Sequence, residues 1–204
     1  MSLARTWSVG LVGVQGAMVE VEVDLAAGVP QVILVGLPDA VVRQSVDRVR
    51  AAITNAGGRF PQRRVTIGLS PASMPKQGSG FDLALAAAVL AAAGDVPKAA
   101  VQRLVLLGEL GLDGSVRGIR GVLPGVLAAA RAGHRQVVVP LSNADEAALV
   151  DGVEVLAVGT LSGLLAHLKG KAPLSPHVRG PLPPVPPAPD LSDVVGQASG
   201  RRQR

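Results

Sequence analysis

The stretch Pro75–Gly94, PKQGSGFDLALAAAVLAAAG, decides how this chain folds. Every residue from Leu83 to Ala93 is apolar, which predicts a helix that is buried on most of its sides. This run is about half as long as the roughly 20 residues that a membrane-spanning helix requires. The glycine-rich loop before it presents Ser79 and then Asp82. Three interpretations are open for this loop: it holds a nucleophile, it cradles a phosphate, or it only leads into the helix.

The segments on either side alternate between strand and helix patterns. Strands are predicted at 19–25, 31–35, 63–69, 104–108, 136–139 and 153–158, and an Asp-Gly hairpin turn at 112–115. Further helices are predicted after Asp39, at 122–132, after Asn143, where Glu146 would complete a capping box, and at 161–168 after Thr160. Because hairpins and helical crossovers both occur, the pattern predicts an α+β domain with two layers and a mixed sheet.

Composition narrows the possible environments and partners. Hydrophobic residues make up 48% of the chain, enough for a core, and cysteine is absent, which excludes disulfides and thiolate metal sites. The first residues lack the continuous apolar region of a signal peptide. We therefore expect a cytoplasmic protein with no membrane partner. The net charge of +5 permits contact with nucleic acid but is too mild to argue for it.

The motifs for nucleotides and metals are not matched. In PKQGSG the lysine precedes the glycines, so the loop is not a Walker A sequence, and Gly10, Gly13 and Gly16 match no dinucleotide fingerprint. The three histidines lack the spacing of a zinc helix. A Ser79–Lys76 dyad would need a lysine whose pKa is lowered by burial. A lysine between proline and glutamine in such a loop is expected to be solvated instead, which argues against catalysis by Ser79.

The composition changes near Lys171. We predict a domain at residues 1–171, a proline-rich linker at 172–189 that forms an extended spacer, and a short terminal segment at 190–204.

Four stretches together resemble the N-terminal domain of the ComM/YifB family of magnesium-chelatase-like AAA+ ATPases. They are VGLPDAVVRQSVDRVRAAITNAG from Val35, the stretch from Phe60 to Gly94, LGELGLDGSVRGIRGVLPGVLAAARAG from Leu107, and VPLSNADEAALVDGVEVLAVGTL from Val139. The resemblance implies a ribosomal protein S5 domain 2-like fold, similar to the proteolytic domain of Lon. Laid on the serine loop of Lon, the catalytic position falls on Gly80, and the residues from Val122 to Gly125 supply no lysine. The resemblance therefore implies a protease loop that has lost its dyad.

The same resemblance sets expectations for the whole family. PDLSDVVGQ, from Pro189, is similar to the entry of the AAA+ module, and the chain ends before a Walker A loop. ATP and magnesium are thus expected only for that module, with no cofactor or metal in this chain, and full-length relatives are expected to form hexamers acting on DNA. We expect a non-catalytic domain for assembly or DNA engagement. Its candidate DNA contacts, which a solvated basic edge explains equally well, are Arg48, Arg50, Arg59, Arg63, Arg64 and Lys76. The alternatives are a Lon-like peptidase using Ser79 and Lys76, or a magnesium chelatase-type subunit.

Overall fold

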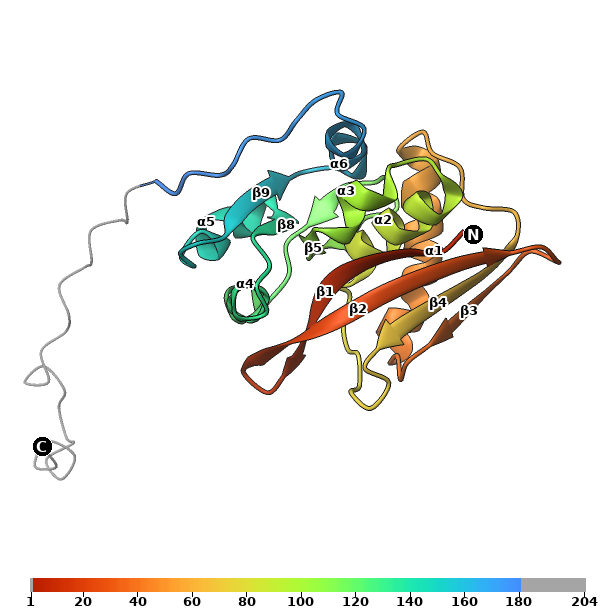
Figure 1. The fold of residues 1–204 in the computed structure, drawn as a ribbon, viewed down its shortest axis with the longest axis horizontal. Helices are drawn as coiled ribbons and strands as arrows, with labels where there is room; N and C mark the ends of the chain where they lie inside the picture. Colours follow the sequence, from red (N-terminus) through yellow and green to blue (C-terminus); the bar gives the residue numbers. More distant parts are fainter. Residues whose placement is uncertain (1, 181–204) are drawn as a thin grey trace, which may run out of the picture.

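Residues 2–180 are described by a computed structural model, and within them seven strands form one sheet in the order β3-β4-β2-β1-β5-β8-β9 (Figure 1). A separate ribbon pairs β6 with β7. The strands are β1 (Ala4–Val12), β2 (Gln15–Ala26), β3 (Gln31–Val35), β4 (Arg64–Ser70), β5 (Val105–Leu106), β6 (Glu109–Leu110), β7 (Val116–Arg117), β8 (Gln136–Pro140) and β9 (Glu154–Val158).

The sheet is mixed, as predicted. β2 runs antiparallel to both β1 and β4, whereas the pairs β3–β4, β1–β5, β5–β8 and β8–β9 are parallel. The predicted Asp-Gly turn joins β6 to β7, where Glu109 lies opposite Arg117. These pairings confirm the α+β class, with a Lon-like arrangement of strands and helices.

The predicted helices are present with small shifts at their ends. Asp39 caps the first helix by accepting a hydrogen bond from the Val42 N–H at 2.7 Å, and Thr160 caps the last by accepting one from the Gly163 N–H at 3.1 Å. The helices are α1 (Ala40–Asn55), α2 (Asp82–Ala93), α3 (Lys98–Gln102), α4 (Val122–Arg131), α5 (Ala144–Ala147) and α6 (Leu161–Leu168), with a 3₁₀ turn at Leu141–Asn143.

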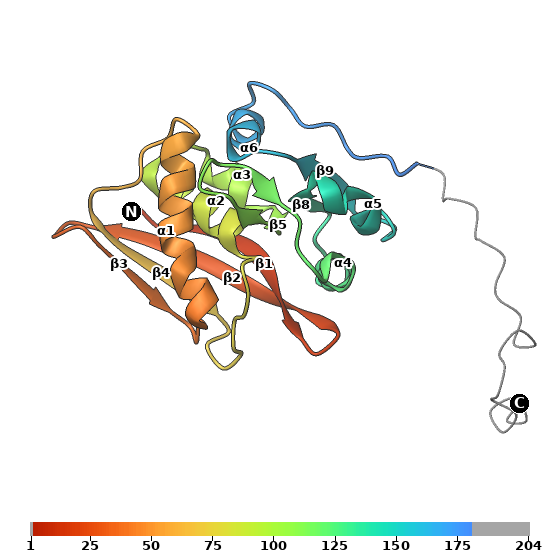
Figure 2. The same cartoon turned by 180° about the vertical axis from the view of Figure 1, so that it is seen from behind.

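Two apolar clusters lie on opposite faces of the sheet. In β8, Val138 belongs to the cluster around α1, α2 and α6, while its neighbours Val137 and Val139 belong to the cluster under α4 and α5. Because successive strand residues point to opposite faces, this alternation places helices on both sides of the sheet at β8. Figure 2 shows α1 crossing β2, β4 and β3 on one face of the sheet. The opposite face of β2 meets α4, where a Cβ on Gly16 would touch Pro124 and Ala128. The predicted two-layer arrangement therefore describes the edge of the sheet at β4 and β3, and α4 and α5 add a third layer from β2 to β9.

Strand β1 was absent from the sequence-based prediction. Its polar residues Thr6 and Ser8 are fully buried, so the strand lacks the alternation that marks one wet face. The Thr6 hydroxyl donates to the Val101 carbonyl at 3.1 Å, and the Ser8 hydroxyl donates to the Leu106 carbonyl at 2.9 Å. These bonds offset the cost of removing both hydroxyls from water.

The beginning of the predicted linker is attached to the domain. Leu174 packs against the larger core, and its N–H donates to Nδ1 of His167 at 2.9 Å. Pro176 bridges Leu156 of β9, and the His177 N–H donates to the Val155 carbonyl at 2.7 Å. We call residues 171–177 the strap. The rest of the predicted linker beyond residue 180, and the segment at 190–204, lie outside the described residues.

Among residues 2–180, no helix combines the length and apolar character needed to cross a bilayer.

Candidate functional site

A cleft of about 440 Å³ opens beside the N-terminus of α2. One wall is the loop Gln77–Gly80, and the facing wall is the segment Gly118–Gly121 that leads into α4. The floor is apolar and includes Val9, Leu11, Phe81, Leu107 and Ile119. Strand β1, Leu107 after β5 and two glycine-rich loops, far apart in the sequence, thus converge on one hollow, which contains the alternative nucleophile Ser79.

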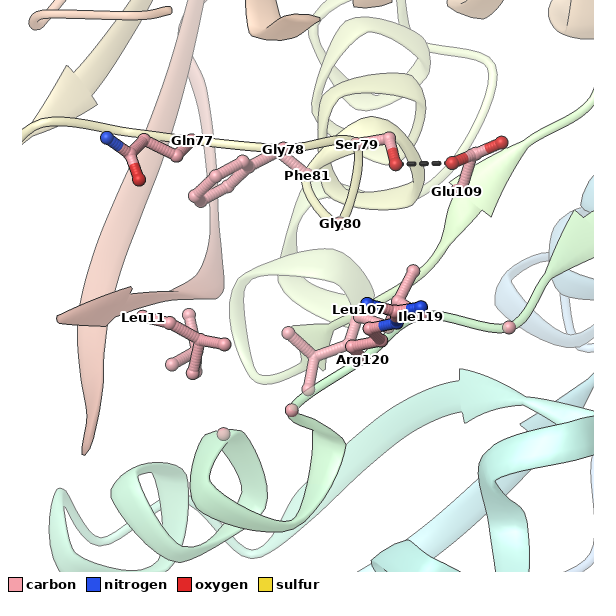
Figure 3. Close-up of a pocket in the computed structure, with 14 residues that line it drawn as sticks. Leu11, Gln77, Gly78, Ser79, Gly80, Phe81, Leu107, Glu109, Ile119 and Arg120 are labelled. Atoms are coloured by element: carbon pink, nitrogen blue, oxygen red, sulfur yellow. Dashed lines mark hydrogen bonds between the residues drawn. The ribbon is translucent and has the colours of Figure 1, made fainter. Parts of the chain in front are cut away.

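The Ser79 hydroxyl is paired with a carboxylate. It donates a hydrogen bond to Oε2 of Glu109, the first residue of β6, and Figure 3 shows the two side chains pointing toward one another. The other carboxylate oxygen of Glu109 lies 3.8 Å from Nη1 of Arg117. A carboxylate is a weak base compared with the imidazole or amine that usually activates a serine. This pairing holds the hydroxyl in place without providing a strong proton acceptor.

Lys76 is buried, which corrects the expectation that it is solvated. Its side chain is fully enclosed, and burial lowers the pKa of its amine. However, Nζ donates to the Pro71 carbonyl, and Lys76 does not line the cleft. Its backbone N–H donates to the Leu37 carbonyl at 3.0 Å, and its own carbonyl accepts from the Asp39 N–H at 2.9 Å. Lys76 therefore ties the loop to the segment before α1, and the structure does not assemble it with Ser79 into a dyad.

Asp82 begins α2, one residue before the predicted start of this helix, and the sequence analysis missed its main partner, Arg48. Its carboxylate is fully buried and accepts from Nε of Arg48 at 2.8 Å, from Nη2 of Arg48 at 3.1 Å, and from the Leu110 N–H at 3.1 Å. Burial raises the pKa of Asp82, and the bonds from Arg48, Ser45 and Leu110 oppose that rise. Arg48 was proposed as a DNA contact. In the structure its guanidinium instead joins α1 to Asp82 at the start of α2, and Asp82 in turn accepts from β6.

The wall opposite Ser79 is held by side chains that the sequence pattern assigned to a capping box. Asn143 accepts from the Ile119 N–H and donates to the Ile119 carbonyl, both at 3.0 Å. Glu146 accepts from the Leu123 N–H at 3.0 Å, in the first turn of α4. Asn143 makes no side-chain capping bond to α5. The capping-box prediction was wrong because these two side chains, three positions apart, bind the backbone of the cleft wall at Ile119 and Leu123 instead of the first turn of α5.

The remaining DNA candidates are exposed and lie near the C-terminal end of α1. Arg50 stacks over Phe60, with Cζ 4.9 Å from the ring centroid, and Arg64 begins β4. Arg59 and Arg63 line one hollow, and Arg59 also lines a second hollow with Lys169 and Lys171. We call Arg59, Arg63, Lys169 and Lys171 the basic cluster. The two lysines were missed because they follow α6, more than 100 residues away in the sequence, and Asp95 is the acidic residue that lines both hollows.

Comparison with known proteins agrees with this architecture. Residues 21–143, which include both walls of the cleft, match the family model described as subunit ChlI of Mg-chelatase. The chain belongs to the ChlI family.

Relatives of this ChlI-family chain extend the match over nearly all its length. An uncharacterized protein of Mycobacterium tuberculosis is 50% identical over 201 residues, covering 98% of this chain and 40% of the relative. Competence protein ComM of Haemophilus influenzae is 36% identical over 214 residues, covering 99% of this chain and 40% of the relative. The predicted resemblance to the ComM/YifB family is thereby confirmed. The chain spans about 40% of the length of these relatives.

The similarity to proteases is also present. Lon protease 2 of Bacillus subtilis is 26% identical over 171 residues, which cover 75% of this chain and 30% of that protein. This match fits the Lon-like fold of the ChlI-family chain. The assignments of cofactors, metals and partners made from the sequence remain predictions.

Proposed function

We propose that this ChlI-family domain is a non-catalytic platform in an ATP-driven motor of the ComM kind, where it serves assembly or DNA engagement. The observation that carries the proposal is the separation of Ser79 from Lys76. The serine hydroxyl is bound to Glu109, and the lysine amine is bound to the Pro71 carbonyl. A scaffold similar to a protease domain thus presents a serine without a strong base beside it.

The parent protein would act in the cytoplasm as a homo-oligomer, and ATP and magnesium would be bound by a separate AAA+ module. The basic cluster is the surface of this domain that best fits DNA, because lysines and arginines neutralise phosphates. Arg50 extends the same surface, because the Phe60 ring beneath it lines the hollow of Arg59 and Arg63. Arg48 and Lys76 are instead bound to Asp82 and to the Pro71 carbonyl.

A DNA titration tests the role in engagement. The 204-residue chain is titrated against branched and single-stranded DNA at about 50 mM and about 200 mM salt. We expect binding at low salt that weakens at high salt and that is reduced in Arg59→Gln/Arg63→Gln. Arg103→Gln, an exposed arginine that lines neither hollow, is the matched control. Absence of binding at low salt would eliminate DNA engagement by this domain.

A second candidate, a Lon-like peptidase, is favoured by the position of Ser79 in the cleft. Incubation of the chain with a labelled unfolded protein distinguishes the two functions. We expect no difference between the natural chain and Ser79→Ala. Cleavage that disappears in Ser79→Ala would establish the peptidase and refute the non-catalytic role.

A further inference from the structure

The cleft has groups that face a ligand and have no partner within the protein. Arg120 lines the cleft, is exposed, and makes no ion pair with any of residues 2–180. Glu109 lines it too, but this carboxylate is already engaged by the Ser79 hydroxyl and lies near Arg117. The uncommitted charge in the cleft is therefore positive.

The backbone groups of the Gln77–Gly80 loop that lack a protein partner also favour a ligand with acceptor atoms. Within the described part of the chain, the N–H groups of Ser79 and Gly80 donate to no protein acceptor, whereas the carbonyls of both residues already accept, from Asp82 and Gly108 respectively. The loop can thus offer donors to a ligand and has fewer free acceptors. Such a site selects a ligand that carries acceptor oxygens.

The floor adds an apolar requirement. Leu11, which is 41% exposed, and the partly buried Ile119 line the cleft, as do the buried side chains of Phe81, beside the Gln77–Gly80 loop, and Leu107 (Figure 3). A volume of about 440 Å³ is within the range of pockets that bind small ligands or a few residues of a peptide. If the apolar part of a ligand lay on this floor, the polar group attached to it would lie near Arg120.

We propose that the cleft binds a carboxylate attached to an apolar group, either the free C-terminus of a peptide that ends in an aliphatic residue or a small aliphatic carboxylic acid. Arg120 pairs with the carboxylate, because a guanidinium forms strong charge-assisted bonds with it. The inference rests on the non-catalytic role proposed above, since the ligand is bound and not cleaved.

The test uses the 204-residue chain and a fluorescent hexapeptide, Gly-Gly-Ser-Gly-Gly-Leu, prepared with a free carboxylate or as the C-terminal amide. Fluorescence anisotropy should show that the acid binds at least tenfold more tightly than the amide. Arg120→Gln should remove this preference, while Arg131→Gln, an exposed arginine of α4 outside the cleft, should keep it.

Competition separates the two sources of the carboxylate. If N-acetyl-leucine displaces the peptide at a similar concentration, the site takes a small acid; if only the peptide acid binds well, the site takes a C-terminus. Equal binding of the acid and the amide, or no binding of any probe at millimolar concentration, would overturn the inference and leave the non-catalytic role standing. Cleavage of the peptide, detected by mass spectrometry and lost in Ser79→Ala, would instead refute the non-catalytic role.

Discussion

The ion pair between Arg48 and Asp82 offers a sharp test of how α1 and α2 are joined. The Asp82 side chain is fully buried, whereas that of Arg48 is 21% exposed. Replacing Arg48 with Met keeps much of the apolar stem and leaves the carboxylate with the Leu110 N–H as its remaining backbone donor. Breaking a buried ion pair from one side costs about 3–5 kcal/mol, and we expect Arg48→Met to lower the free energy of unfolding by about this amount.

The two partners should not be equivalent. In Asp82→Asn the freed guanidinium can turn toward water, so this change should cost less, about 1–2 kcal/mol. The double variant Arg48→Met/Asp82→Asn should be more stable than Arg48→Met alone by about 2 kcal/mol, because no uncompensated charge remains in the interior. Arg43→Met, on the exposed face of α1, is the control and should change stability by less than about 0.5 kcal/mol.

The assay is urea unfolding followed by circular dichroism, at several pH values. Burial already raises the pKa of Asp82, and removing Arg48 removes an interaction that opposes this rise. The folded state of Arg48→Met then takes up a proton at a higher pH than the unfolded chain does. Its stability relative to the natural chain should therefore improve as the pH falls from 7 toward the ordinary Asp value of 3.8. Equal costs for the two single variants, or a pH-independent gap, would refute this reasoning.

Three further predictions concern other parts of the fold. Asp39→Ala removes the cap of α1 and the acceptor of the Gly78 N–H, so urea unfolding should show a loss of about 1–2 kcal/mol, against less than about 0.5 kcal/mol for the exposed Asp47→Ala. The ring centroids of Trp7 and His134 lie 5.2 Å apart, and burial lowers the pKa of His134. The fluorescence of this single tryptophan should therefore change with pH, with a midpoint below pH 6.5, and His134→Phe should abolish the transition. A Cβ at Gly16 would lie 2.4 Å from the Pro124 carbonyl oxygen, so Gly16→Ala should lower the free energy of unfolding by about 1–3 kcal/mol and lower the melting temperature. Gly180→Ala, whose Cβ would have no heavy atom within 4 Å, should leave both quantities unchanged.

Much of the fold could be predicted because local patterns and long-range packing agree. Leu83–Ala93 forms a buried helix, and the ends of β3 and α6 match the predictions exactly where turn and cap residues mark them. Strand β1 could not be found in this way because its buried Thr6 and Ser8 bind carbonyls of a segment about 95 residues away. A search for alternating apolar residues misses a strand whose buried positions hold polar side chains that form hydrogen bonds inside the core.

The site was predicted only in part for a similar reason. The sequence singled out Ser79 and argued against a dyad with Lys76 because the lysine was expected to be solvated. That reason was wrong, because the amine is enclosed and donates to the Pro71 carbonyl. Glu109 was missed since 30 positions separate it from Ser79 and no motif relates them. The DNA-contact prediction was based on charge alone, so it could not separate Arg48, which is paired with the buried Asp82, from the exposed arginines nearby.

The strap has a mechanical consequence. Pro176 and His177 contact β9 one after the other along the chain, and the His177 ring also pairs with Asp145 of α5, with Nε2 and Oδ1 2.8 Å apart. A pull applied at Gly180 would load these contacts in series and open them one at a time, at lower force than shearing a paired strand would need. Residues 175–177 would then be released under tension, while the Leu174 side chain, packed against the core, sets the point at which peeling stops.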